Sequence, residues 1–171
     1  DRRIMASIIK VDTIQTAAGG TPTATGLGLN TTGSVLQVVT VTDNTNTSIT
    51  SSSHSDTSIT GNITPSSTSS KILVVGAIQV MVYINGGSSS DGYYRIRNST
   101  NSTSSSDFYI QNYDYGGSGT IQDASRAVQW LDSPASTSTQ TYLIQMKKGG
   151  GNAIVANNGG TSSLTLIEIA G

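Results

Sequence analysis

The sequence contains no cysteine, only three prolines and a single glutamate, and it has few charged or aromatic residues. Without cysteine, the chain can form no disulfide, no thiolate zinc site and no cysteine nucleophile. Charged residues make up 11% of the 171 residues, against about 25% in an average soluble domain. Because long helices draw on glutamate, lysine and arginine, this deficit excludes a coiled coil or a helix bundle as the main architecture.

The charge balance and the lengths of the hydrophobic runs exclude two further classes of protein. Nine basic and ten acidic residues give a net charge of −1, and no basic run is present, so we expect no nucleic-acid binding. The longest apolar stretch, residues 72–84, is too short to span a bilayer, which requires about 20 apolar residues. We therefore expect no membrane insertion.

Small polar residues and glycine dominate the rest of the composition, with 27 serines, 24 threonines, 19 glycines and 11 asparagines. Such a composition is common in flexible linkers. However, hydrophobic residues still make up 35% of the chain, and they are gathered into short runs. This clustering favours a folded β protein with polar loops.

Eight short runs have the β-branched and alternating pattern of strands: residues 34–42, 58–63, 71–84, 92–98, 107–113, 127–131, 141–147 and 163–170, with residues 153–155 as a candidate ninth. Glycine and serine clusters separate them, and all three prolines lie outside them. Polar segments at residues 43–56, 85–91 and 98–106 are expected to be loops. Short strands with dense turn signals predict an all-β fold, an antiparallel jelly-roll sandwich.

Two of these runs are apolar on both faces, at residues 71–84 and 163–170. A strand of this kind is covered on both sides, either by a second sheet or by another subunit. A chain with so few charges also has little charge repulsion to keep apolar faces in solution. We therefore predict that copies of the chain associate, and the candidate core of this assembly, a trimer if the resemblance described below holds, is formed by Leu164, Leu166, Glu168, Ile144 and Met146.

The first 33 residues differ in composition from the rest, so we divide the chain into an extended arm, residues 1–33, and a head, residues 34–171. Residues 7–15 can form one strand, which must pair with the head or add to a sheet edge of another protein. A frayed terminus and a docking arm both remain open. In a docking arm, the contacts would come from Ile8, Ile9, Val11 and Ile14. We expect Met5 to be the natural start, because codons for the four preceding residues can contain a purine-rich stretch.

No motif in the sequence indicates catalysis. Ser53, His54 and Asp56 are neighbours in a polar segment, whereas a Ser-His-Asp hydrolase needs these groups to converge from separate elements. The aspartates that could form a glycosidase pair are all flanked by turn residues: Asp91, Asp107, Asp114, Asp123 and Asp132. We expect the protein not to be an enzyme and to have no catalytic residue, no metal and no cofactor.

Tyrosines are concentrated in one part of the chain, with five of the seven between residues 93 and 115. A tyrosine ring can stack on a sugar while its hydroxyl forms hydrogen bonds, so this region can contact a glycan. The same residues can also be ordinary sheet-face or subunit-contact residues. The candidate receptor contacts are Tyr93, Tyr94, Tyr109, Tyr113 and Tyr115.

Five segments resemble structural proteins of marine bacteriophages and cyanophages. They are MASIIKVDTIQTAAGG at residues 5–20, GSVLQVVTVT at 33–42, SSKILVVGAIQV at 69–80, LDSPASTSTQTYLIQMK at 131–147 and SSLTLIEIAG at 162–171. The chain is similar to short phage fibre heads with a trimeric, C1q/TNF-like jelly roll. The resemblance implies a non-enzymatic homotrimer on the surface of the virion, attached through its first segment to other virion proteins of the tail or capsid.

Two virion functions fit this resemblance. The first is a tail-fibre-like head that contacts a receptor on the host surface, such as a glycan. The alternative is a capsid decoration or cement protein, favoured by the absence of a fibre shaft, because only residues 5–33 precede the first predicted strand of the head. A third interpretation, from another class, is an enzyme that acts on polysaccharides.

Overall fold

The computed structural model describes residues 15, 18–20, 22, 32–84, 89–113 and 121–171. The strands in this part of the chain all lie between residues 35 and 169, and no described helix is long and apolar enough to cross a membrane. The predicted arm contacts Ile8, Ile9, Val11 and Ile14 lie outside the described residues, as does Tyr115. Docking through the arm therefore stays a prediction.

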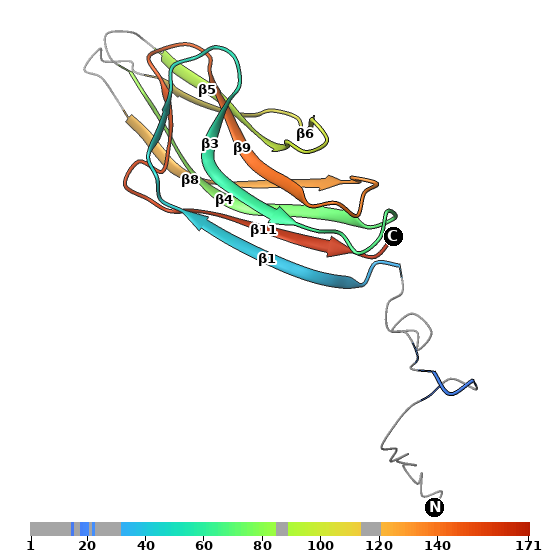
Figure 1. The fold of residues 1–171 in the computed structure, drawn as a ribbon. Coiled ribbons are helices and arrows are strands. Elements are labelled where there is room, and N and C mark those ends of the chain that lie inside the picture. Colours follow the sequence, from blue (N-terminus) through green and yellow to red (C-terminus); the bar gives the residue numbers. More distant parts are fainter. Residues whose placement is uncertain (1–14, 16–17, 21, 23–31, 85–88, 114–120) are drawn as a thin grey trace, which may run out of the picture.

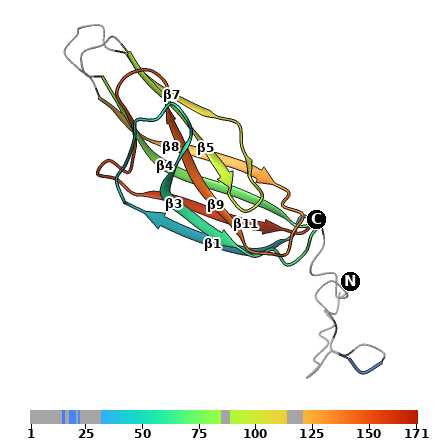
Figure 2. The same ribbon diagram turned by 45° about the horizontal axis from the view of Figure 1, so that its top comes forward.

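The strands form two antiparallel sheets that face each other (Figures 1 and 2). Sheet A contains β1 (Val35–Asp43), β2 (Thr47–Ile49), β4 (Lys71–Tyr83), β8 (Ile121–Asp132), β10 (Ile154–Ala156) and β11 (Ser162–Ile169). Sheet B contains β3 (Ser55–Ile63), β5 (Ser89–Asn98), β6 (Thr103–Ser104), β7 (Phe108–Tyr113) and β9 (Gln140–Lys148).

The order of the strands shows how the chain winds between the sheets. Sheet A has the order β1–β11–β4–β10–β2, with β8 also paired to β4, and sheet B has the order β3–β9–β5–β6, with β7 also paired to β5. From β3 onward, the chain crosses to the opposite sheet before β4, β5, β8, β9 and β10. The predicted all-β sandwich of the jelly-roll type is confirmed.

The eight predicted strands are all present, and the candidate ninth is β10. The largest difference is β8, which starts at Ile121 instead of residue 127, because its polar first half pairs with β4 as far as Tyr83. The short strands β2 and β6 lie in segments that were predicted as loops. These two segments are strands because they pair with β10 and β5, although their own composition is typical of a turn.

The hydrophobic core lies between the two sheets, and it corrects the predicted trimer core. Leu164, Leu166 and Glu168 on β11 and Ile144 and Met146 on β9 are at most 1% exposed in a single chain. They have no surface left for a neighbouring copy. Period-two alternation shows which residues share a face, but it does not show which face meets the second sheet. Any contact between copies must use other residues.

Glu168, the single glutamate, is held by donors from two other segments. Its Oε2 accepts from Gln37 Nε2 at 2.6 Å, and its Oε1 accepts from the Ser66 backbone N–H and hydroxyl, both at 2.7 Å. Burial raises the pKa of Glu168, but the surrounding hydrogen-bond donors, which include Ser66 and Gln37, outweigh it and hold the pKa below its usual value. The ionised carboxylate thus joins β11 to β1 and to the β3–β4 connection.

Because the Glu168 carboxylate is ionised in the folded chain, we expect acid to destabilise the protein. Because the pKa of Glu168 is lower in the folded chain than in the unfolded chain, its contribution is complete above the ordinary glutamate pKa of about 4.3 and is lost as the pH falls below it. We expect Glu168→Gln to flatten the fall in unfolding free energy between about pH 5 and pH 3, measured by urea denaturation. An equally steep fall in the variant and the unaltered protein would refute this role.

A second buried polar cluster joins the two sheets. Asp132 Oδ2 on β8 accepts from Asn98 Nδ2 on β5 at 2.9 Å and from the Tyr142 hydroxyl on β9 at 2.8 Å. Asn98 also donates to Gln140 Oε1 at 3.0 Å. Burial and the bond to Asp132 raise the pKa of Tyr142, so its hydroxyl stays protonated and can donate. Asp132, one of the candidate glycosidase carboxylates, is therefore placed inside the sandwich.

Candidate functional site

The outer face of sheet B carries three of the predicted tyrosines. Strand alternation points Tyr93 on β5 outward, and does the same for Tyr109 and Tyr113 on β7. In the sheet register, Tyr93 is paired with Tyr109 on one side and with Lys147 of β9 on the other. We call Tyr93, Tyr109, Tyr113, Lys147 and the adjoining Asp107 the tyrosine face.

Two aromatic rings of this face contact each other, and one of them also contacts a cation. The ring centroids of Tyr93 and Tyr109 lie 5.1 Å apart with an interplanar angle of 47°, and Lys147 Nζ lies 4.7 Å from the Tyr93 centroid. Both contacts are in the range of favourable aromatic and cation–π interactions. Tyr109 and Tyr113 are nevertheless 49% and 55% exposed. The face is ordered by its own contacts and still offers aromatic surface to solvent.

Tyr94, another predicted receptor contact, has a different role. It is only 4% exposed, and its ring stacks on Phe108 at a centroid distance of 5.3 Å. Neighbouring residues of a strand point to opposite sides of the sheet, so Tyr93 and Tyr94 cannot share a face. The prediction that Tyr94 contacts a receptor is therefore wrong, and the residue belongs to the core.

Asp107 organises the polar edge of the tyrosine face. Its Oδ1 lies 2.9 Å from His54 Nε2, and its Oδ2 lies 2.8 Å from Lys147 Nζ. Burial raises the pKa of Asp107, but the bond from Lys147 and the nearby His54 outweigh it and hold the pKa below its usual value. An ionised carboxylate only accepts hydrogen bonds, so His54 Nε2 carries the proton. Burial, and then the charge of Arg95, lowers the pKa of His54, which leaves the ring neutral at neutral pH.

A second polar chain crosses the same face beside the tyrosines. Arg95 donates from Nε and Nη2 to Gln145 Oε1 at 3.0 and 2.8 Å, and Gln145 Nε2 donates to Asp56 Oδ1 at 2.6 Å. These three residues lie on β5, β9 and β3, so the chain spans the sheet. The Arg95 head group is held in one orientation by this contact.

The sequence showed the tyrosines but not their polar partners. In the sequence, the acidic residue nearest to His54 is Asp56. In the structure, the hydrogen-bond partner of His54 is instead Asp107, which comes from the loop before β7. Arg95 lies two residues after Tyr93 on β5, so strand alternation points both side chains to the outer face of sheet B. The contacts of Lys147 depend on the pairing of β5 with β9, which no local pattern encodes.

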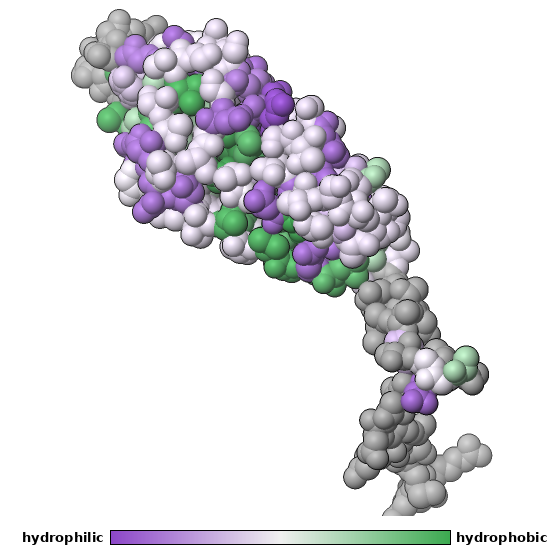
Figure 3. Space-filling model, viewed as in Figure 1, coloured by the Kyte–Doolittle hydropathy of each residue, from purple (hydrophilic) through white to green (hydrophobic). Residues whose placement is uncertain are grey.

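The outer face of sheet A has the opposite character. One row across β1, β11, β4 and β8 consists of Val38, Ile167, Leu73 and Leu131, and we call it the aliphatic face. Val38 and Leu131 are 57% and 50% exposed. On one side, the next two rows contain only uncharged residues: Thr40, Thr165, Val75, Gln129, Thr42, Ser163, Ala77 and Ala127. On the other side, the neighbouring row includes the exposed Lys71, paired with Ile169. Hydrophobic residues can be seen gathered along β1 in Figure 3.

The aliphatic face bears on the prediction that β4 is covered on both sides. Sheet B covers the inner face of β4, where Ile72, Val74 and Ile78 are fully buried. On the outer face, Leu73 and Val75 are only partly buried. Sheet B of the same chain thus covers one face of β4, as expected. That another subunit covers the outer face of β4 stays a prediction.

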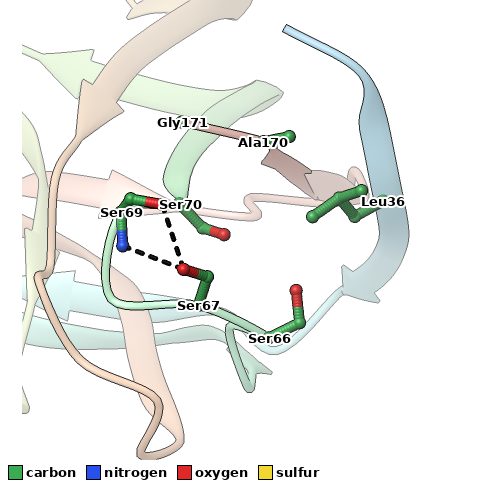
Figure 4. A pocket seen from close by; sticks show the side chains of 7 residues that line it. All are labelled: Leu36, Ser66, Ser67, Ser69, Ser70, Ala170 and Gly171. Carbon is green, nitrogen blue, oxygen red and sulfur yellow. Dashed lines mark hydrogen bonds between the residues drawn. The ribbon is translucent and has the colours of Figure 1, made fainter. Parts of the chain in front are cut away.

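Two clefts lie away from the tyrosine face. One, of about 310 Å³, is found where β1 begins and β11 ends (Figure 4), and its lining consists of Leu36, Ser66, Ser67, Ser69, Ser70, Ala170 and Gly171. Its serine hydroxyls offer hydrogen bonds, but no lining side chain is a general acid or base. The other, of about 340 Å³, is lined by Phe108, Ala127, Val128 and Gln129. In the part of the chain that the structure describes, no three His, Asp or Glu side chains are grouped to hold a metal ion.

The remaining aspartates that were candidates for a glycosidase pair have separate partners. Asp91 accepts from the Gly150 backbone N–H, and Asp123, on the outer side of β8, accepts from Gln79 Nε2 at 2.6 Å. Asp114 lies outside the described residues. Asp91 thus stabilises a turn and Asp123 forms a surface contact, whereas Asp132 is buried and Asp107 is paired with His54 and Lys147.

Comparison with known proteins adds little to this geometry. No protein-family model matches the chain, and no curated protein matches it. Among solved structures, the chain is similar to one in "Structure of infectious bursal disease virus Gt strain", with 15% sequence identity and a TM-score of 0.26. The match covers 79% of this chain but only 38% of the viral chain. A likeness at this TM-score carries no argument about function.

Proposed function

We propose that the protein is a non-enzymatic component of a bacteriophage particle surface, and that its head binds a receptor on the host cell through the tyrosine face. The observation that carries this proposal is the exposure of Tyr109 and Tyr113 on an ordered surface. Neither residue belongs to the core between the sheets. The resemblance of several segments to phage structural proteins supplies the virion context.

We further propose that three copies of the head associate through the aliphatic face. Large apolar side chains are left on the outside of sheet A, and the aliphatic face and the next two rows on its Val75 side carry no charge that association would have to bury. The tyrosine face is on the opposite sheet, so an assembly of this kind leaves it free. Attachment to the rest of the particle is assigned to the arm, residues 1–33.

Host-cell binding tests the receptor function. We expect the purified, fluorescently labelled protein to bind cells of the host bacterium and to compete with adsorption of the phage, because both use the same receptor. Tyr109→Ala should reduce cell binding by about tenfold, as expected for the loss of one exposed aromatic contact of roughly 1.4 kcal/mol. Absence of binding to host cells, with adsorption unaffected by excess protein, would contradict the proposal.

The capsid decoration alternative predicts a different set of results. In that case, particles lacking the protein would adsorb to cells normally but would lose infectivity at a lower temperature. Reconstruction of the particle would place the protein across the shell instead of at the tail. These results would replace the receptor function with a role in stabilising the capsid.

A further inference from the structure

We propose that the receptor of the tyrosine face is a neutral, hydroxyl-rich glycan, an inference that rests on the proposed receptor-binding function. The face combines exposed aromatic rings with fixed hydrogen-bonding groups on a flat sheet. Sugars present both apolar C–H faces and closely spaced hydroxyls. The surface therefore matches the two kinds of contact that a sugar chain can make.

The spacing of the tyrosines fits an extended ligand. Tyr109 and Tyr113 lie on the same strand four residues apart, a separation of about 13 Å along an extended backbone. Tyr93 widens the platform at Tyr109, because its ring lies beside that of Tyr109 in the register of β5 and β7. Neither of the two clefts described above is lined by a residue of the tyrosine face, and we expect a ligand of this face to lie across the sheet surface. A chain of several sugar rings suits this length.

Hydrogen-bonding groups surround the aromatic platform. Gln111 points outward between Tyr109 and Tyr113, and its partner in the register of β5 is Asp91. Asp107 and Lys147 lie on the other side of Tyr93. Carboxylate and amide oxygens accept from sugar hydroxyls, whereas the ammonium and amide N–H groups donate to them. Donors and acceptors are thus present on both flanks of the rings.

The charge pattern favours a neutral ligand over an acidic one. Lys147 is paired with Asp107, and Arg95 is bound through Gln145 to Asp56. Lys147 and Arg95, the two cations nearest Tyr93, therefore each already have a carboxylate that compensates their charge, directly or through one amide. The nearby carboxylate of Asp91 would repel an anionic sugar, which would also have to displace these partners.

The ring contact predicts how two substitutions at one position will differ. Tyr109→Ala removes the exposed ring, whereas Tyr109→Phe keeps the ring and loses only the hydroxyl. Tyr109 is solvent-exposed, so both variants should fold, and thermal unfolding of each protein checks this. A stacking contact predicts a large loss of binding in the first variant and a small one in the second.

The test uses polysaccharide extracted from the envelope of host cells and separated by anion exchange into neutral and acidic fractions. Binding of the full-length protein to each fraction is measured by affinity electrophoresis, beside binding to intact cells. We expect retardation by the neutral fraction, a loss of about tenfold in affinity for Tyr109→Ala, and a change within about twofold for Tyr109→Phe.

Three outcomes of the fraction-binding test would overturn the inference while the receptor function stands. These are binding to cells without binding to the neutral fraction, binding to the acidic fraction alone, and binding to the neutral fraction that Tyr109→Ala leaves unchanged. Cell binding that survives periodate oxidation of surface glycans but is lost after protease treatment would assign the receptor to the proteins. Failure to bind intact cells would instead contradict the proposed function itself.

Discussion

Replacing Asp132 by alanine is expected to lower the free energy of unfolding by about 3–5 kcal/mol, a large part of the 5–15 kcal/mol of a typical domain. The carboxylate accepts from Asn98 and from the Tyr142 hydroxyl, and both donors are fully buried. Without Asp132, the Tyr142 hydroxyl loses its acceptor and the Asn98 amide loses one of its hydrogen bonds while it keeps the one to Gln140. Each buried N–H or O–H left unpaired costs about 1–3 kcal/mol. Urea denaturation at neutral pH measures the difference.

Asp123→Ala provides a matched control for this substitution. Asp123 is on the same strand, β8, but it is exposed and its contacts with Gln79 and Asn158 are at the surface. We expect a change within about 0.5–1 kcal/mol. Tyr142→Phe should fall between the two, since it removes one donor and leaves Asn98 paired with Asp132. Equal effects of Asp132→Ala and Asp123→Ala would show that the buried cluster does not hold the sheets together.

Replacing Leu73 by glutamate is expected to convert the proposed trimer to monomers at micromolar concentration. Leu73 lies in the middle of the aliphatic face, between Ile167 and Leu131, and the adjoining row through Val75 contains no charge. In a threefold assembly, the variant would bury three carboxylates without partners. A buried unpaired charge of this kind costs several kcal/mol, so association should weaken by at least about 100-fold.

Sedimentation equilibrium measures this change, with Thr60→Glu as the control. Thr60 is exposed on the outer face of β3, in the opposite sheet, so the same charge is added where no contact between copies is proposed. We expect Thr60→Glu to remain trimeric and Leu73→Glu to sediment as a folded single chain of about 17.6 kDa. A trimer that survives Leu73→Glu would place the contact between copies on another surface.

The strands could be predicted from the sequence because each has a local signature. The run at residues 71–84 is a continuous apolar stretch rich in valine and isoleucine, and β4 has nearly these bounds. By contrast, β2 and β6 depend on strands far away in the sequence, so their polar residues gave no local signal. The first half of β8 was missed for the same reason, since pairing with β4 outweighs its composition.

The functional surface was predictable only in part. The cluster of tyrosines directed attention to β5 and β7, and alternation separates Tyr93 from Tyr94 once the strand is known. Alternation alone could not show that Leu164 and Leu166 face sheet B instead of a neighbouring copy. The pairing of His54 and Lys147 with Asp107 requires the three-dimensional arrangement of two loops and a strand.

An experimental structure of the assembled protein, determined by crystallography or on the intact particle, tests the account most directly. We expect this structure to show three heads around a threefold axis, with Leu73 and Val38 facing the axis and Tyr109 and Tyr113 directed outward. Either a solitary head or a subunit contact built from the tyrosine face would contradict this expectation.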